Sequence, residues 1–155
     1  MAENLCVKMG GSVKSGVKLL YMIDACVTAD TSGGSTVGTH NDIRHFALDP
    51  SYVSFSPNAN GAYYDTAGST IFYTNILKSA KVNLILLCTS SGTSHPCIVN
   101  HIHSGTTTTL FNTDSDGMHT VSNVSLEAGD KLTFKILGHS NQNSVQGRAL
   151  LVYAV

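Results

Sequence analysis

The segment V-N-H-I-H-S-G, Val99 to Gly105, carries two histidines that are two positions apart. Successive side chains of a β-strand point to opposite faces, so His101 and His103 would lie on the same side of a strand. Two neutral imidazoles can bind one transition-metal ion, but a zinc site needs four ligands, or three and a water molecule. The segment therefore predicts either a metal pair that needs further ligands, or two histidines that are hydrogen-bonded or exposed to solvent.

Other residue patterns give little support for catalysis. The sequence contains neither a G-x-S-x-G nucleophile motif nor a cysteine-protease signature. The segment G-G-S-V-K-S-G lacks the spacing of a phosphate-binding loop. The ten acidic residues include several in expected turns, which is a poor source for a pair of glycosidase carboxylates. We therefore expect a protein that is not an enzyme, with a metal-dependent enzyme using His101 and His103 as an alternative.

Several expected loops are rich in Ser, Thr, Asn, Asp and Tyr, whose hydroxyl, amide and aromatic groups recognise sugars or adapt to protein surfaces. The candidate ligand-binding residues in these loops are Tyr63, Tyr64, Asp65, Ser91, Thr93, His95, Asn141 and Asn143. Binding is thus a better prediction than catalysis, and no cofactor is expected apart from a transition metal at the histidine pair.

Length and charge narrow the class of protein. A chain of 155 residues is of single-domain size. Only 12% of its residues are charged and the net charge is −1, which predicts no binding to nucleic acid or to an anionic membrane. The N-terminus shows no export signal, and apolar runs such as Leu84 to Cys88 are too short to span a bilayer. We expect a soluble protein.

The four cysteines, Cys6, Cys26, Cys88 and Cys97, match neither a zinc-knuckle spacing nor a dense disulfide framework. We expect them to be reduced thiols that are buried as small apolar residues. Cys88 and Cys97 flank an expected hairpin loop, so they are the pair best placed for a bridge.

The chain reads as strands separated by turns. Apolar and polar residues alternate, breakers recur every eight to twelve residues, and no amphipathic helix is evident. The expected strands are 5–9, 17–27, 52–56, 70–76, 81–88, 97–103, 107–112, 119–124, 131–137 and 148–155. About ten strands are enough for two packed sheets, so we predict an all-β sandwich with little or no helix.

Two strands differ from the simple alternation of K-L-T-F-K-I-L, in which Leu132, Phe134 and Ile136 share one face. K-V-N-L-I-L-L-C becomes apolar on both faces, and the terminal A-L-L-V-Y-A-V is apolar throughout. One face packs in the sandwich core. A chain without helices offers no second layer for the other face, so we expect a neighbouring subunit to cover it, with an ordinary central strand under loops as the alternative.

The expected organisation is one domain with a separable N-terminal piece. Residues 29–39, A-D-T-S-G-G-S-T-V-G-T, have too little apolar content to pack and predict a flexible loop. They separate residues 1–28, a first hairpin or a docking arm, from a head domain over residues 40–155.

From about Tyr52 onward the order of elements resembles the trimeric jelly roll of the tumour-necrosis-factor and complement globular-head superfamily. The similar segments are T-I-F-Y-T-N-I-L-K-S-A-K-V-N-L-I-L-L, then V-S-L-E-A-G-D-K-L-T-F-K-I, and last G-R-A-L-L-V-Y-A-V. The last of these is similar to the closing strand of the family, which lies near the three-fold axis. The resemblance implies a homotrimer with Leu151, Tyr153 and Val155 at its interface, and outer loops that bind a partner.

Heads of this kind also occur in bacteriophage fibres and capsid decorations, and trimeric phage fibres use His-x-His sites on their axis. The resemblance therefore implies that three copies of His101 and His103 could surround one metal ion; a further histidine of the same chain is another way to complete a site. We predict a non-enzymatic homotrimeric attachment module of a phage virion, whose partners are virion proteins or a cell-surface glycan or protein. A soluble carbohydrate-binding lectin of the same architecture is the alternative.

Overall fold

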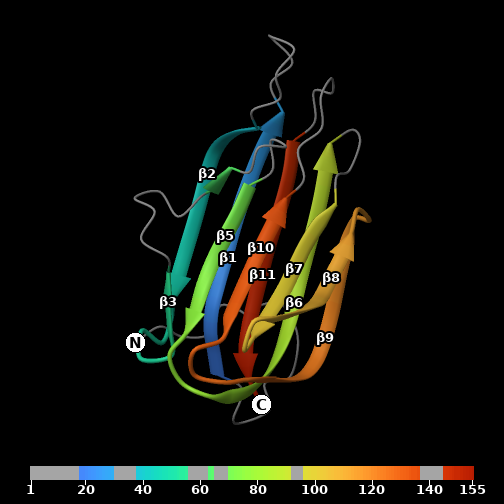
Figure 1. Ribbon diagram of the computed structural model, residues 1–155. Coiled ribbons are helices and arrows are strands. Elements are labelled where there is room, and N and C mark those ends of the chain that lie inside the picture. Colours follow the sequence, from blue (N-terminus) through green and yellow to red (C-terminus); the bar gives the residue numbers. More distant parts are fainter. Residues whose placement is uncertain (1–17, 30–37, 56–62, 65–69, 92–95, 137–144) are drawn as a thin grey trace.

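The protein is a sandwich of two antiparallel sheets (Figure 1). The computed structural model describes residues 18–29, 38–55, 63–64, 70–91, 96–136 and 145–155. The strands are β1 (Lys18–Ala29), β2 (Gly38–Ala47), β3 (Val53–Phe55), β4 (Tyr63–Tyr64), β5 (Thr70–Ile76), β6 (Ala80–Ser91), β7 (Cys97–His103), β8 (Thr106–Thr113), β9 (Gly117–Leu126), β10 (Lys131–Ile136) and β11 (Val145–Ala154). Within the described ranges there is no helix long and apolar enough to cross a membrane.

The strand order is that of a jelly roll. One sheet has the order β2-β1-β11-β6-β9, and the other has the order β3-β5-β10-β7-β8, with β4 paired to β5. The predicted all-β, two-sheet sandwich is confirmed. Strands β11 and β6 lie at the centre of the first sheet, where the sequence is apolar on both faces.

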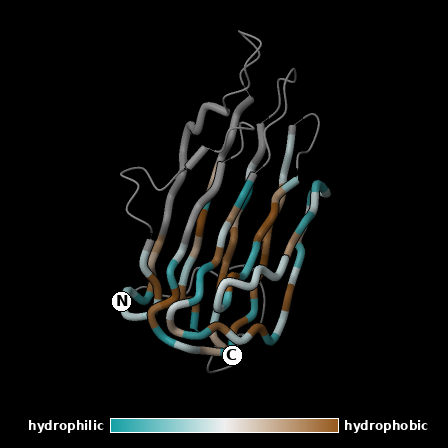
Figure 2. Tube along the Cα trace, viewed as in Figure 1, coloured by the Kyte–Doolittle hydropathy of each residue, from teal (hydrophilic) through white to brown (hydrophobic). Residues whose placement is uncertain are grey.

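The core lies between the sheets and follows the predicted alternation, which is visible along the strands in Figure 2. On β10, Leu132 and Phe134 are buried while Lys131 is exposed. On β6, the residues that face the core are Val82, Leu84, Leu86 and Cys88, each at most 1% exposed. On these strands every second side chain thus faces the core, as the side-chain period of two requires.

The opposite, outward face of the five-stranded sheet is also apolar at its centre. Its residues alternate with the core residues and form two neighbouring cross-strand rows, one of Met22, Leu151 and Ile85 and one of Ala149, Leu87 and Met118. We call these six residues the outer apolar face. Its side chains are partly exposed, except Leu151 at 9% and Met118 at 66%. No described element of the chain forms a layer over it.

Two connections between consecutive strands cross from one sheet to the other. β8 and β9 belong to different sheets, so Asp116 and Gly117 are not the tip of a hairpin between them. Asp116 instead accepts hydrogen bonds from the N–H and hydroxyl of Ser90, at 3.1 and 2.9 Å. A turn pattern shows where the chain reverses, but it does not show which strand the chain joins next.

Cys88 and Cys97 likewise stand on strands of different sheets, so the expected hairpin loop between them is a crossover. Both are buried in the core and both thiols are free. Burial raises the pKa of each thiol above its ordinary value, which keeps them protonated and unreactive. For these two cysteines the structure shows buried thiols and no bridge. Cys6 and the side chain of Cys26 lie outside the described residues.

The N-terminal region differs from the prediction at its boundaries. Ala29, placed in the flexible loop by its composition, pairs with Gly38, and Thr28 pairs with Thr39. The expected loop therefore contributes strand residues at both of its ends, because backbone pairing between β1 and β2 compensates for their low apolar content. β1 pairs with both β2 and β11, which places it inside the five-stranded sheet. The expected strand over residues 5–9 lies outside the described residues.

Candidate functional site

The site is built around Asp130, the last residue of the turn between β9 and β10. Glu127 N–H donates to Asp130 Oδ2 at 2.8 Å, and Asp130 N–H donates to the Glu127 carbonyl at 3.0 Å. Gly129, with a φ of 97°, supplies the left-handed conformation that this turn needs. The carboxylate is therefore held by its own turn.

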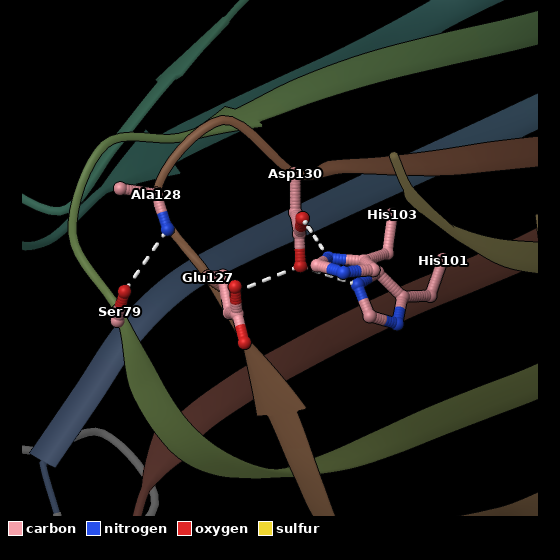
Figure 3. Close-up of polar contacts among 6 residues, drawn as sticks. All are labelled: Ser79, His101, His103, Glu127, Ala128 and Asp130. Carbon is pink, nitrogen blue, oxygen red and sulfur yellow. Dashed lines mark hydrogen bonds and ion pairs between the residues drawn. The ribbon is translucent and has the colours of Figure 1, made fainter. Parts of the chain in front are cut away.

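The turn is in addition fixed to the neighbouring connection between β5 and β6. Ile76 N–H donates to the Asp130 carbonyl at 2.9 Å, and Gly129 N–H donates to the Ile76 carbonyl at 2.8 Å. Ala128 N–H donates to Ser79 Oγ at 3.0 Å (Figure 3). Asp130 thus sits on a rigid support at one end of the sandwich.

His101 and His103 come from β7 and face inward. His101 lies opposite Leu132, a core residue of β10, and side chains paired in this way share a face of the sheet. His103 lies two positions further along, where β7 ends and the two-residue turn Ser104–Gly105 leads into β8. Both residues of that turn have a positive φ, 47° and 80°, as a tight hairpin turn requires.

Both imidazoles bind the Asp130 carboxylate, as Figure 3 shows. His101 Nε2 is 2.6 Å from Oδ2, and His103 Nδ1 is 2.8 Å from Oδ1. The Asp130 side chain is 4% exposed and that of His101 13%, whereas that of His103 is 47% exposed. The result is a buried carboxylate between one nearly buried and one accessible imidazole.

The hydrogen bonds decide the charge of the carboxyl group. Burial alone would raise the pKa of Asp130, but the Glu127 N–H and the two imidazoles stabilise the ionised form, and the net effect lowers the pKa below its ordinary value. The hydrogen bond to Asp130 raises the pKa of His103, and the charges of Asp130 and Glu127 add to this. Asp130 is therefore an anion at neutral pH, and His103 is easier to protonate than a free histidine.

A pH dependence of stability follows from the raised pKa of His103. The stabilisation by protonated His103 is complete below its unfolded value of 6.5 and is lost as the pH rises through the higher folded value. We expect the free energy of unfolding of chelator-treated protein, measured in urea, to fall as the pH rises from about 6.5 through the raised folded pKa of His103. The His103→Gln variant should lose that fall while Asp130, His101 and Glu127 remain. If wild type and His103→Gln showed the same dependence of unfolding free energy on pH, His103 would not be the group responsible.

The sequence identified the two histidines but missed Asp130. Asp130 occurs there only within the segment V-S-L-E-A-G-D-K-L-T-F-K-I, with no role of its own. The described residues contain one group of at least three His, Cys, Asp or Glu whose ligand atoms converge, and it is His101, His103 and Asp130. The third member is a carboxylate of the same chain, where the sequence suggested a further histidine or symmetry-related copies.

The other predicted site residues lie elsewhere or outside the described part. Leu151 and Tyr153 face outward from β11, and Val155 follows that strand with 57% exposure. Of the candidate ligand-binding residues, Tyr63, Tyr64 and Ser91 are described only as strand residues. Asp65, Thr93, His95, Asn141 and Asn143 are outside the described residues. The predicted loop site therefore stays a prediction.

Comparison with known proteins adds a likeness of fold. No protein-family model matches the sequence, and no curated protein matches it. A family 32 carbohydrate-binding module from C. perfringens NanJ, solved with galactose, is 14% identical over 88% of this chain and 98% of its own, with a TM-score of 0.39. Murine APRIL is 10% identical over 82% and 98% of the two chains, with a TM-score of 0.31. Envelope protein VP37 of White Spot Syndrome Virus is 9% identical over 91% and 99%, with a TM-score of 0.30. Likenesses this distant carry no argument about function.

Proposed function

We propose that the protein is a non-enzymatic homotrimeric attachment head, of the kind that phage fibres and capsid decorations carry, and that it binds a surface glycan or protein through loops at its periphery. The outer apolar face is the observation that supports this proposal. The outward face of an antiparallel sheet is commonly polar when water covers it. Here Ile85 and Leu87 of β6 alternate with core residues and lie beside Leu151 and Ala149 of β11.

The other sheet provides an internal comparison. The outward residues of β10 are Lys131, Thr133 and Lys135, so this face is polar at its centre. The two outward isoleucines of β7, Ile98 and Ile102, lie opposite Lys135 and Lys131. Lysine stems can cover such neighbours while the ammonium groups remain in water. The outward face of the six-stranded sheet is thus polar at its centre, whereas the outer apolar face is suited to a second copy of the chain.

Trimerisation would give attachment its strength. Three equal heads bind a repetitive surface through sites that are individually weak, because the second and third contacts form at a high effective concentration. The gain is on the order of 10²-fold or more when the geometry allows simultaneous binding. A binding module can therefore work without a deep pocket in each subunit.

The mass in solution tests the assembly. Light scattering on the intact chain should give about three times the 16.4 kDa of one chain. Ile85→Lys introduces a charge at the centre of the outer apolar face and should yield monomers, because a buried unpaired charge costs several kcal/mol. Ile98→Lys is the matched control, since Ile98 is also partly exposed but lies on the outward face of the other sheet, and it should leave the trimer intact.

A monomeric wild-type protein would overturn the proposed assembly, and equal effects of the two variants would remove the outer apolar face as its basis. A glycan array with the trimer then separates a sugar-binding head from one that contacts protein. Saturable binding that free sugar competes away indicates a glycan partner.

A further inference from the structure

We propose that His101, His103 and Asp130 form a binding site for one divalent transition-metal ion of the zinc class. The site lies within a single chain and does not depend on the proposed trimer. It uses two imidazole nitrogens and one carboxylate oxygen, which are donors that Zn²⁺ prefers.

The three donor atoms already lie close together. They are within 4.8 Å of one another, and each imidazole nitrogen is 2.6 or 2.8 Å from a carboxylate oxygen. Around a tetrahedral zinc ion with bonds of about 2.0–2.2 Å, neighbouring ligand atoms are roughly 3.3–3.5 Å apart. Side-chain shifts of the order of an ångström or less would make room for the ion between the donors.

The proton balance of binding is simple. In the metal-free site a neutral imidazole donates its N–H to Asp130, and that nitrogen must offer a lone pair to bind a metal. The single proton of each neutral ring moves to its other nitrogen, and a ring that is protonated beforehand releases one proton to solvent. The Asp130 carboxylate then supplies the negative charge that the ion needs in a buried position.

The hydrogen bonds that Asp130 makes with neighbouring backbone groups would orient it as a metal ligand. The Glu127 N–H bonds to Oδ2, and the backbone of Asp130 is tied to Ile76. Such hydrogen bonds orient a ligating carboxylate before the metal arrives. The histidines stand on a strand, which holds them more precisely than a loop would.

The difference in exposure among the three ligands gives the ion a route into the site. His103 is half exposed, whereas Asp130 and His101 are nearly buried, so an ion would enter past His103. Three protein ligands leave one tetrahedral position for water or another small ligand. The exposed side of His103 is where that position would open to solvent.

The proposal is tested with the full chain after chelator treatment and dialysis. Calorimetric titration with Zn²⁺ should give one ion per chain, and Co²⁺ should produce visible absorption bands typical of a low-symmetry site. His103→Gln should weaken Zn²⁺ binding by more than about 100-fold, because loss of an outer-shell partner alone commonly costs 10–100-fold. His103 is half exposed, so this variant should fold.

The control is His119→Gln, because His119 is a partly buried histidine of β9, on the other sheet, and its imidazole binds the Ser115 carbonyl. This variant should bind Zn²⁺ as the wild type does. Absence of binding to wild-type protein overturns the proposal, as does binding that persists in the His101→Gln, His103→Gln double variant. Light scattering of the same samples keeps the two proposals apart, since a monomer that binds zinc refutes only the trimer.

Discussion

Asp130→Ala is expected to lower the free energy of unfolding of the metal-free protein by about 3 kcal/mol. The substitution removes the acceptor of the Glu127 N–H and of both imidazoles. A hydrogen bond to a charged group contributes about 1.5–3 kcal/mol, and a buried donor left without a partner costs about 1–3 kcal/mol. The half-exposed His103 can turn to water, so most of the loss comes from Glu127 N–H and His101.

Urea unfolding in the presence of a chelator measures this effect. Asp114→Ala is the control, because Asp114 is an exposed acidic residue between β8 and β9, and it should change stability by no more than about 0.5 kcal/mol. Asp130→Asn should fall between the two, since it keeps the shape of the side chain and loses its charge. If Asp130→Ala were as stable as Asp114→Ala, the carboxylate would not hold this end of the sandwich together.

Phe134→Ala is expected to have the largest effect of a single core substitution, a loss of about 4 kcal/mol. Phe134 is 1% exposed and stands on β10, between β5 and β7 at the middle of the six-stranded sheet. Removal of a buried phenyl ring loses its transfer free energy and leaves a cavity, which together cost about 3–5 kcal/mol. Strands on both sides of β10 would have to move to fill the space.

Lys131→Ala is the control on the same strand, because Lys131 points to solvent and its removal creates no cavity. Unfolding should be followed at one fixed protein concentration, since the stability of an oligomer depends on concentration. If the Phe134→Ala and Lys131→Ala proteins had the same free energy of unfolding, the side chain of Phe134 would not contribute to the core as the structure indicates.

The sequence predicts the sandwich well because burial of one face of a strand requires apolar and polar residues to alternate within that strand. Leu132 and Phe134 alternate with polar residues, and that period of two identifies both the strand and its inner face. Two long strands with apolar residues on both sides, β6 and β11, could also be recognised as central. Both properties are readable within six to twelve residues of chain.

Features that depend on distant partners could not be predicted. β2 was missed because its sequence lacks a regular alternation, and its pairing with β1 makes it a strand. The role of Asp130 depends on the register that places Leu132 opposite His101, and sequence spacing alone gives no such register. The histidine pair was visible because both members lie on one strand, whereas the carboxylate that joins them lies on another.

The pairing of β1 with β11 has a consequence for how the chain folds. Lys18 pairs with Ala154 and Thr28 with Val145, so the five-stranded sheet joins segments that are far apart in sequence. Folding rates fall as the sequence separation of contacts grows, and sandwiches of this type commonly fold in milliseconds to seconds. During synthesis β1 and β2 must wait for residues 145–154 before the sheet can close. Until then an edge of β1 is open, and the nascent chain is exposed to wrong pairing with its neighbours.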